Sequence, residues 1–380
     1  MTEKIKNIVL TCVMVVLLFG LTLFAWFKPT DDFSDSERRE LAKFPAFNAE
    51  TVFNKDSNKT FMKLFESYSL DQFPLRDKFR TLKSYVAFNV FGHMDNNNIY
   101  VEDGYAAQLE YPLNEESLDF ATGKFGAIYD KFIKQHGANV YFSIVPDKGY
   151  FLAAENGYLA LDYSEMFALM QEKMDFADYI DITGELELSD YYKTDTHWKQ
   201  ENLLDVAQKI GAEMGTPLSE KYTQTLLDNP FYGVYYGQSA LPLPAEDMYY
   251  MTNAMLENCI VYDHQNMRQI SIYDMERAFG KDPYEMYLGG NLSVVTIENP
   301  SASTDKELVV FRDSFGASLT PLLVEGYKKI TVVDIRYVQS ALLGSMRDNR
   351  TGAPLVDFRN ADDVLFIYST LILNNSNTLR

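Results

Sequence analysis

Twenty consecutive residues near the N-terminus carry no charge, from Ile8 to Phe27, and this run limits the topologies open to the rest of the chain. A helix rises ~1.5 Å per residue, so a helical run of this length matches the ~30 Å hydrocarbon core of a bilayer. Lys4 and Lys6 precede the run, whereas acidic residues beginning with Asp31 follow it closely. Because positive charge favours the cytoplasmic side, we expect a single-pass anchor with a cytoplasmic N-terminus and an extracellular main domain.

A cleaved signal peptide is the alternative interpretation of this segment. Signal peptides end in a small-x-small cleavage site, and no such site follows this run, which is also long for a signal. Trp26 and Phe27 lie where an interfacial aromatic belt is expected. The sequence therefore favours a retained anchor, with residues 1–28 forming a cytoplasmic tip and a membrane helix.

The charge balance and the cysteines exclude several classes of protein. The chain has 34 basic and 54 acidic residues, for a formal net charge of -20. Binding to nucleic acid requires a basic face, so we expect no nucleic-acid partner. Cys12 lies inside the apolar run and is not expected to pair with Cys259, so no disulfide framework is predicted.

Residues 29–95 are expected to form a linker and a helical N-terminal extension. Apolar residues from Phe61 to Tyr68 recur at spacings of three and four, which is typical of an amphipathic helix. Pro74 should interrupt that helix, because proline lacks a backbone donor and restricts the residue before it. A turn then leads into a predicted hairpin over residues 99–109.

Residues 96–380 alternate between helical and strand patterns. Alternation of this kind predicts an α/β domain with a mostly parallel sheet flanked by helices. Residues 215–300 break the rhythm and are expected to form an inserted β-containing region. Strands are predicted at 139–145, 179–182, 307–311, 330–335 and 364–368, and helices at 115–136, 163–174, 198–213 and 317–327.

The segment Thr194-Asp195-Thr196-His197-Trp198 is the first candidate for chemistry. One interpretation is structural, with Thr or Asp capping a helix and Trp packing in the core. The other is catalytic, because an Asp beside a His can hold the imidazole tautomer and stabilise the imidazolium that a general base forms. The segment alone does not decide between them.

The segment Arg312-Asp313-Ser314-Phe315-Gly316 follows a continuous apolar strand and is the second candidate. Asp313 or Ser314 could simply be a helix N-cap. Alternatively, Ser314 lies at a strand-to-helix turn on the carboxyl edge of a parallel sheet, where open α/β sheets bind ligands. The N-terminus of the following helix would then offer backbone N–H groups to an oxyanion.

Metal and nucleotide chemistry have weaker support. Asp195 and His197 could supply two metal ligands, but no second cluster has ligand-like spacing, so no metal is expected. The glycines are too sparse for a phosphate-binding loop, and no dinucleotide fingerprint occurs. We therefore expect no cofactor.

Several short motifs lie in an order that is typical of one known family. They are Ser36-Glu37-Arg38-Arg39-Glu40-Leu41, Asp71-Gln72-Phe73-Pro74-Leu75-Arg76-Asp77, the segment from Tyr191 to Trp198, Leu288-Gly289-Gly290-Asn291, Arg312-Asp313-Ser314-Phe315 and Val333-Asp334-Ile335-Arg336-Tyr337. Together they resemble the DHHW family of bacterial SGNH-hydrolase-like proteins, relatives of the alginate O-acetyltransferases. The first His of Asp-His-His-Trp is Thr196 here, as in the alginate-type relatives.

The resemblance implies a permuted SGNH-hydrolase-like fold and a role for each site residue. Ser314 would be the nucleophile, His197 the base and Asp195 the residue that orients the base. Arg336, Trp198, Asn291 and Tyr337 would contact substrate, although an ion pair of Arg336 with Asp334 is an open alternative.

The activity implied by the resemblance is serine-dependent transfer or removal of an acyl group, such as acetyl, on a cell-surface polysaccharide. A membrane-bound O-acyltransferase would be the partner that supplies acyl groups across the bilayer. The alternative is a non-catalytic glycan-binding surface protein with an inactive SGNH-like site. The six Phe and Tyr residues within 231–250 would favour that alternative if they were exposed.

Overall fold

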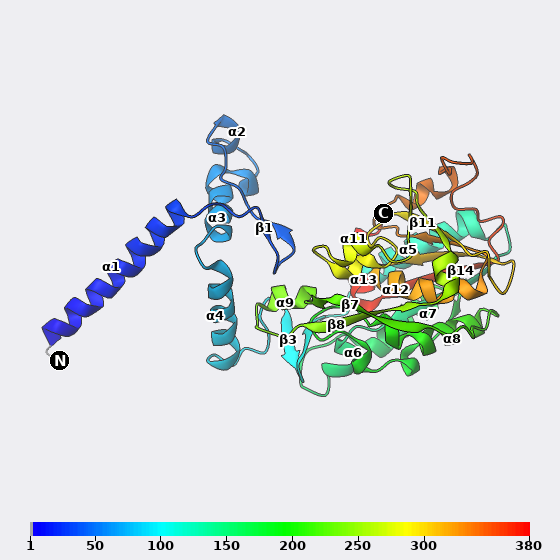
Figure 1. Ribbon diagram of the computed structural model, residues 1–380, viewed down its shortest axis with the longest axis horizontal. Coiled ribbons are helices and arrows are strands. Elements are labelled where there is room, and N and C mark those ends of the chain that lie inside the picture. Colours follow the sequence, from blue (N-terminus) through cyan, green and yellow to red (C-terminus); the bar gives the residue numbers. More distant parts are fainter. Residues whose placement is uncertain (1–2) are drawn as a thin grey trace. The chain divides into compact units, whose positions relative to one another are not determined.

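The computed structural model describes residues 3–380, which divide into two compact units (Figure 1). The first unit contains the chain up to Asn97 together with Tyr236–Pro242, and the second contains Asn98–Tyr235 and Leu243–Arg380. Helix α1 spans Glu3–Phe27 and buries none of its residues. It is long and apolar enough to cross a membrane, which agrees with the expected single-pass anchor and is also true of signal sequences.

Eight strands form the central sheet of the second unit. Their order is β10 (Arg268–Ile270), β9 (Ile260–Asp263), β11 (Val294–Glu298), β13 (Lys329–Val333), β12 (Glu307–Arg312), β14 (Asp363–Ser369), β5 (Asn139–Val145) and β6 (Asp178–Tyr179). From β13 to β6 every neighbouring pair is parallel. Strands β11, β9 and β10 add an antiparallel edge. The predicted fold class, a mostly parallel sheet with helices beside it, is confirmed.

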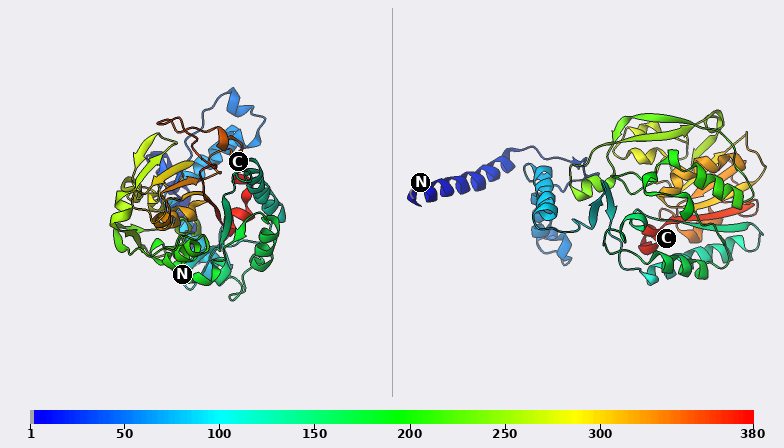
Figure 2. Two further views of the ribbon diagram at one scale, coloured as in Figure 1. Left: turned by 90° about the vertical axis from the view of Figure 1, so that its right-hand side faces the viewer. Right: turned by 90° about the horizontal axis from the view of Figure 1, so that it is seen from below.

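Helices cover both faces of this sheet (Figure 2). Alternate residues of β12 enter two separate cores: Leu308 and Val310 face one, and Val309 and Phe311 face the other. This is the expected result of the two-residue period of a strand that is buried on both faces. Helices α8 (Leu204–Glu213) and α12 (Ser314–Leu323) pack on the first face, and α5 (Glu115–Ile128), α7 (Tyr163–Lys173) and α13 (Thr370–Asn374) pack on the second.

One half of the region 215–300 lies outside the central sheet, and the other half contributes strands to it. Its first half forms a separate hairpin of β7 (Thr223–Phe231) and β8 (Glu246–Thr252). Its second half supplies β9, β10 and β11 to the central sheet. Strand β11 is buried over its first four residues and pairs with both β13 and β9, so its apolar run forms an interior strand. The remaining elements are β3 (Ile99–Glu102), β4 (Tyr105–Gln108), α6 (Gly149–Leu152), α9 (Val234–Ser239), α10 (Ala254–Asn258) and α11 (Met275–Ala278).

Three predicted helices differ from the structure in their bounds. The helix expected at 317–327 is α12, which begins earlier, at Ser314, and ends at Leu323. The helix expected at 115–136 ends as α5 at Ile128 and continues as a π-helical turn, Tyr129–Ile133. The helix expected at 198–213 begins only at Leu204. Residues 198–203 do not extend it because the side chains of Trp198 and Gln200 are fully buried and hydrogen bond to Ser318 of α12. Only a single 3₁₀ turn, Gln200–Asn202, forms there.

The first unit contains α2 (Ala49–Val52), α3 (Phe61–Asp71) and α4 (Arg76–Asn89), with strands β1 (Phe33–Ser34) and β2 (Arg39–Glu40). The predicted break at Pro74 is confirmed. Asp71 accepts from both terminal nitrogens of Arg39, at 2.8 and 2.5 Å, and from the backbone N–H of Ala42 at 2.8 Å. The Arg39 guanidinium holds the pKa of Asp71 below its usual value. Two of the motifs that carried the family resemblance therefore bind each other.

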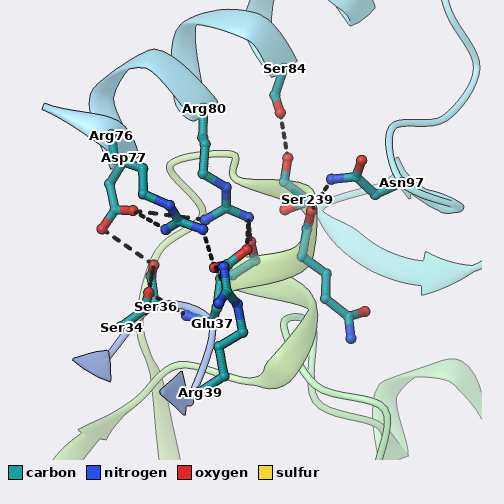
Figure 3. A network of polar contacts seen from close by, with 12 residues as sticks. Ser34, Ser36, Glu37, Arg39, Arg76, Asp77, Arg80, Ser84, Asn97 and Ser239 are labelled. Carbon is teal, nitrogen blue, oxygen red and sulfur yellow. Dashed lines mark hydrogen bonds and ion pairs between the residues drawn. The ribbon is translucent and has the colours of Figure 1, made fainter. Parts of the chain in front are cut away.

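Glu37 is the centre of a second polar network in this unit (Figure 3). Its carboxylate pairs with Arg39 at 2.9 Å, with Arg80 at 2.9 Å, and with Arg76. Arg80 also donates to the carbonyl of Gly237 at 2.7 Å. Three guanidinium groups around one carboxylate fix β2 and α4 relative to each other.

Replacing Asp71 by alanine should loosen the first unit. The change removes an acceptor shared by a guanidinium and a backbone amide, and charge-assisted hydrogen bonds of this kind contribute about 1.5–3 kcal/mol. We expect faster hydrogen exchange at the Ala42 amide, measured by mass spectrometry. Asp77→Ala is the control, because the Asp77 carboxylate is 61% exposed. Unchanged exchange at Ala42 in Asp71→Ala would contradict the assignment.

Candidate active site

The turn between β12 and α12 determines how Ser314 is presented. Asp313 is the N-cap of α12, and its Oδ1 accepts from the N–H of Phe315 at 3.0 Å. Its Oδ2 accepts from the backbone N–H and the hydroxyl of Ser369, at 2.8 and 2.6 Å, where β14 ends. The capping interpretation of this motif therefore applies to Asp313. Asp313 is the cap, which leaves the Ser314 hydroxyl at the first helical position available for another partner.

Asp195, His197 and Ser314 form a continuous series of hydrogen bonds. Nδ1 of His197 lies 2.6 Å from Oδ1 of Asp195, and Nε2 lies 2.7 Å from Oγ of Ser314. A carboxylate can only accept, so Nδ1 carries the proton and Nε2 can accept from the hydroxyl. Two clusters far apart in the sequence thus meet in the geometry that a nucleophile and its base require.

The carboxylate of Asp195 is held from more than one direction. Its side chain is only 1% exposed. Oδ1 also accepts from the backbone N–H of His197 at 3.1 Å, and Oδ2 accepts from the N–H of Val234 at 2.8 Å. Gly233, the residue before Val234, donates its N–H to the hydroxyl of Thr194 at 2.9 Å. The segment that carries Asp195 and the start of α9 are therefore in direct contact.

The imidazole of His197 lies flat against an aromatic ring. Its ring centroid is 3.8 Å from that of Tyr284, with 8° between the planes. The hydroxyl of Tyr284 lies 2.7 Å from that of Ser318 in α12. Burial keeps the pKa of Tyr284 well above its usual value, so the phenol stays protonated and can act as a donor. A stacked ring of this kind limits rotation of the imidazole.

The expected contact of Trp198 with substrate needs correction. Its side chain is fully buried, and its indole N–H donates to the carbonyl of Phe315 at 3.1 Å and to the hydroxyl of Ser318 at 2.9 Å. Trp198 therefore has no surface to offer a ligand. The packing interpretation applies to it, since it anchors the His197 segment to the first turns of α12.

The other three expected substrate contacts have polar partners within the chain. Arg336 donates to both carboxylate oxygens of Asp334, at 3.0 and 2.7 Å, and its side chain is 13% exposed. Its guanidinium carbon lies 5.4 Å from the ring centroid of Tyr337, which is exposed. Asn291 is also exposed, and its amide donates to Glu285 at 2.9 Å. The ion pair left open by the sequence is present, and the substrate roles of all three stay predictions.

A buried lysine beside Asp195 was not identified from the sequence. Nζ of Lys148 donates to the carbonyls of Tyr192 and Lys193, at 2.8 and 3.2 Å, and lies 5.0 Å from the ring centroid of Tyr235. Burial lowers the pKa of the Lys148 amine to about 7, against the opposing attraction of the Asp195 carboxylate. The sequence offered one indication of Lys148. It follows shortly after β5, so it lies at the same carboxyl edge of the parallel sheet as Ser314.

Glu246 fixes the other side of the same segment. Its carboxylate accepts from the N–H of Lys193 at 2.7 Å, and from the N–H and hydroxyl of Thr194, both at 2.8 Å. The sequence offered no signal for this contact, because Glu246 lies within the region 215–300. Among residues 3–380, no group of three or more His, Cys, Asp or Glu side chains is placed to hold a metal ion.

Gly233→Ala should displace Asp195. A Cβ at this position would lie 2.2 Å from the carbonyl oxygen of Thr194 and 2.3 Å from the backbone of Asp195, and neither backbone group can rotate away. We expect a loss of about 2 kcal/mol or more in the free energy of unfolding, measured with urea. At Gly123 in α5 an added Cβ would meet nothing within 4 Å. Gly123→Ala is therefore the control and should be neutral or stabilising by up to about 1 kcal/mol. Equal stability of the two variants would refute the close contact.

Lys148→Met should change how stability depends on pH. The pKa of Lys148 is about 7 in the folded protein and about 10.4 when unfolded. Between these values the unfolded chain binds the extra proton, so this group makes the native protein more stable as pH rises. Urea unfolding at pH 7 and pH 9.5 should show a smaller gain in the variant than in the wild type. An identical gain in both proteins would mean that Lys148 keeps its ordinary pKa.

The comparisons with known proteins concern the fold. No protein-family model matches the chain, and no curated protein is significantly similar to it. A solved DHHW family protein from Eubacterium siraeum matches with a TM-score of 0.60 and 19% identity, over 75% of this chain and 94% of that one. Bacillus cereus PatB1 with a sulfonyl adduct matches with a TM-score of 0.55 and 19% identity, over 72% and 95%. The O-acetyltransferase domain of Pseudomonas putida AlgJ has a TM-score of 0.44 at 13% identity, over 73% and 92%. The chain therefore shares the fold of a DHHW family protein, as its motifs predicted.

Proposed function

We propose that this protein is a serine-dependent acyltransferase or esterase that uses Ser314, His197 and Asp195 as a catalytic triad. The observation that carries the proposal is the hydrogen-bonded series from Asp195 through His197 to Ser314, with both contacts at 2.7 Å or less. Helix capping does not account for this series, because Asp313 already caps α12. The shared fold supports the same class of activity at a coarser level.

The reaction has two halves. Oγ of Ser314 attacks the carbonyl carbon of the donor ester while Nε2 of His197 takes the hydroxyl proton, and Asp195 stabilises the imidazolium. The tetrahedral intermediate collapses, the bond to the donor alcohol breaks, and His197 returns the proton to that alcohol. A sugar hydroxyl or water then attacks the acyl-serine while His197 takes its proton. The bond between the acyl carbon and Oγ breaks, and His197 returns the proton to Oγ of Ser314. The backbone N–H groups that begin α12 are the donors available to the oxyanion.

The proposed substrate is an acetylated or acceptor polysaccharide at the cell surface. An extracellular main domain anchored by α1 would keep the site near that polymer. A single helix provides no path for an acyl donor across the bilayer, so a membrane-bound O-acyltransferase is the partner that would supply acyl groups. Choice between transfer and hydrolysis depends on how well the acyl-serine is shielded from water.

The non-catalytic alternative depended on an exposed aromatic surface within residues 231–250. Phe231 and Tyr235 are buried in the core, so they offer no face to a glycan. Tyr232 is exposed, whereas Tyr236, Tyr249 and Tyr250 are only half-buried, and scattered exposed rings are common on protein surfaces. The aromatic residues therefore give this alternative little support.

Covalent labelling tests the nucleophile directly. We expect a small sulfonyl fluoride to modify Ser314 in the wild type, located by peptide mass spectrometry, because a base-activated hydroxyl attacks such reagents. Turnover of an aryl acetate should fall by at least about 10³-fold in Ser314→Ala and by about 10²–10⁴-fold in Asp195→Asn. Ser345→Ala is the control, since Ser345 is an exposed serine outside the series.

Two outcomes would contradict the proposed triad. Wild-type turnover matched by Ser314→Ala, with both proteins folded by circular dichroism, would exclude Ser314 as the nucleophile. Turnover that is lost in Ser314→Ala but unchanged in Asp195→Asn would exclude Asp195 as the orienting residue.

A further inference from the structure

Large apolar side chains are exposed along residues 44–70 of the first unit. Phe47 is 76% exposed, Phe53 80% and Met62 70%, and Phe44 and Leu70 are also exposed. Soluble surfaces rarely gather this many apolar side chains in one short segment without a binding role. The segment thus has the properties of a contact surface.

Contacts between aromatic rings give this surface a defined shape. Phe44 meets Phe61, Phe65 and Tyr68 edge-on, with ring centroids 6.4, 5.9 and 5.2 Å apart. Phe47 meets Phe61 in the same way at 4.9 Å. We refer to Phe44, Phe47, Phe61, Phe65 and Tyr68 as the aromatic cluster. The rings support one another while much of their area stays open.

Hydrogen bonds join the end of α3 to the segment that follows α1. Gln72, which follows α3, donates to the carbonyl of Asp31 at 2.8 Å and accepts from its N–H at 2.9 Å. Asp31 comes shortly after Phe27, the last residue of α1. A groove of about 580 Å³ lies between the two elements, lined by apolar residues of α1 and by Phe44, Phe65, Tyr68 and Phe73. The cluster therefore lies beside the outer part of the membrane helix.

The charge of this segment differs from that of the rest of the chain. Residues 44–70 contain Lys55, Lys59 and Lys63 against Glu50, Asp56 and Glu66, so the segment has no net charge in a chain of -20. Exposed apolar rings on a segment without net charge bind the interface of a bilayer through burial of the rings.

We propose that the aromatic cluster, together with Phe53 and Met62, inserts into the phospholipid leaflet that surrounds the C-terminal end of α1. The proposal goes beyond the acyl-transfer function and rests only on the anchoring by α1. It commits to lipid as the occupant, because the surface continues the apolar side of the membrane helix and has no net charge that would oppose insertion. The first unit would then be held against the bilayer at two places.

Spin labelling of the full chain in vesicles tests this contact. Both native cysteines are replaced by alanine, and a nitroxide is attached at Met62→Cys in mixed phosphatidylcholine and phosphatidylglycerol vesicles. Collisions with oxygen, which dissolves in lipid, are compared with collisions with a water-soluble nickel complex. Leu226→Cys on β7, an exposed apolar position in the second unit, is the matched control. Val13→Cys within α1 reports whether the anchor is inserted.

The expected result is a several-fold lower nickel collision rate and a higher oxygen rate at residue 62 than at residue 226. Adding Phe47→Glu should restore nickel access at residue 62, because a charge in the cluster opposes insertion. Nickel access at residue 62 with an immersed label at residue 13 would overturn the proposal while leaving the anchor intact. Shielding of residue 62 from both reagents would also overturn it, since that pattern indicates cover by a protein surface. A label at residue 13 that nickel can reach would instead refute the anchoring and the proposal with it.

Discussion

The carboxylate of Asp313 is the constraint on which the site depends. One of its oxygens caps α12 and the other binds both donors of Ser369, so the start of the helix is fixed to the end of β14. The group is fully buried, where an unpaired carboxylate would be costly. Because every contact must be kept, the turn before Ser314 has little freedom. The position of the Ser314 hydroxyl, our proposed nucleophile, is thus set by the contacts of its neighbour Asp313.

A second set of buried contacts brings His197 to Ser314. One turn into α12, Ser318 accepts from Trp198 at its hydroxyl and from Gln200 at its carbonyl. The hydroxyl of Tyr284 lies 2.7 Å from the Ser318 hydroxyl, and the Tyr284 ring stacks on His197. Ser318 therefore connects the His197 segment to the Ser314 segment, although its sequence context is that of an ordinary helical serine. Preorganisation of this kind fixes the distance between base and nucleophile before any substrate binds.

Local sequence patterns predicted those parts of the structure that local interactions determine. The strand-turn-helix signal around Ser314 and the Asp-x-His spacing were visible because each depends on adjacent residues. The partners of Asp195 were not, since the N–H of Val234 is a group that nearly every residue has. The substrate role of Trp198 came from the family resemblance, whereas the packing alternative is the one that the buried indole supports. The late start of α8 likewise depends on tertiary contacts.

The region 215–300 supplies most of the groups that surround the Asp–His pair. Gly233 and Val234 contact the Asp195 segment, Glu246 fixes its backbone, and Tyr284 lies against the imidazole. A shortened protein in which this region is replaced by a simple linker would keep Ser314 on its helix but would lose the enclosure that orients His197. Exchanging this region between proteins of the same fold would therefore also exchange the contacts that orient His197, together with any contacts that the region makes with a ligand.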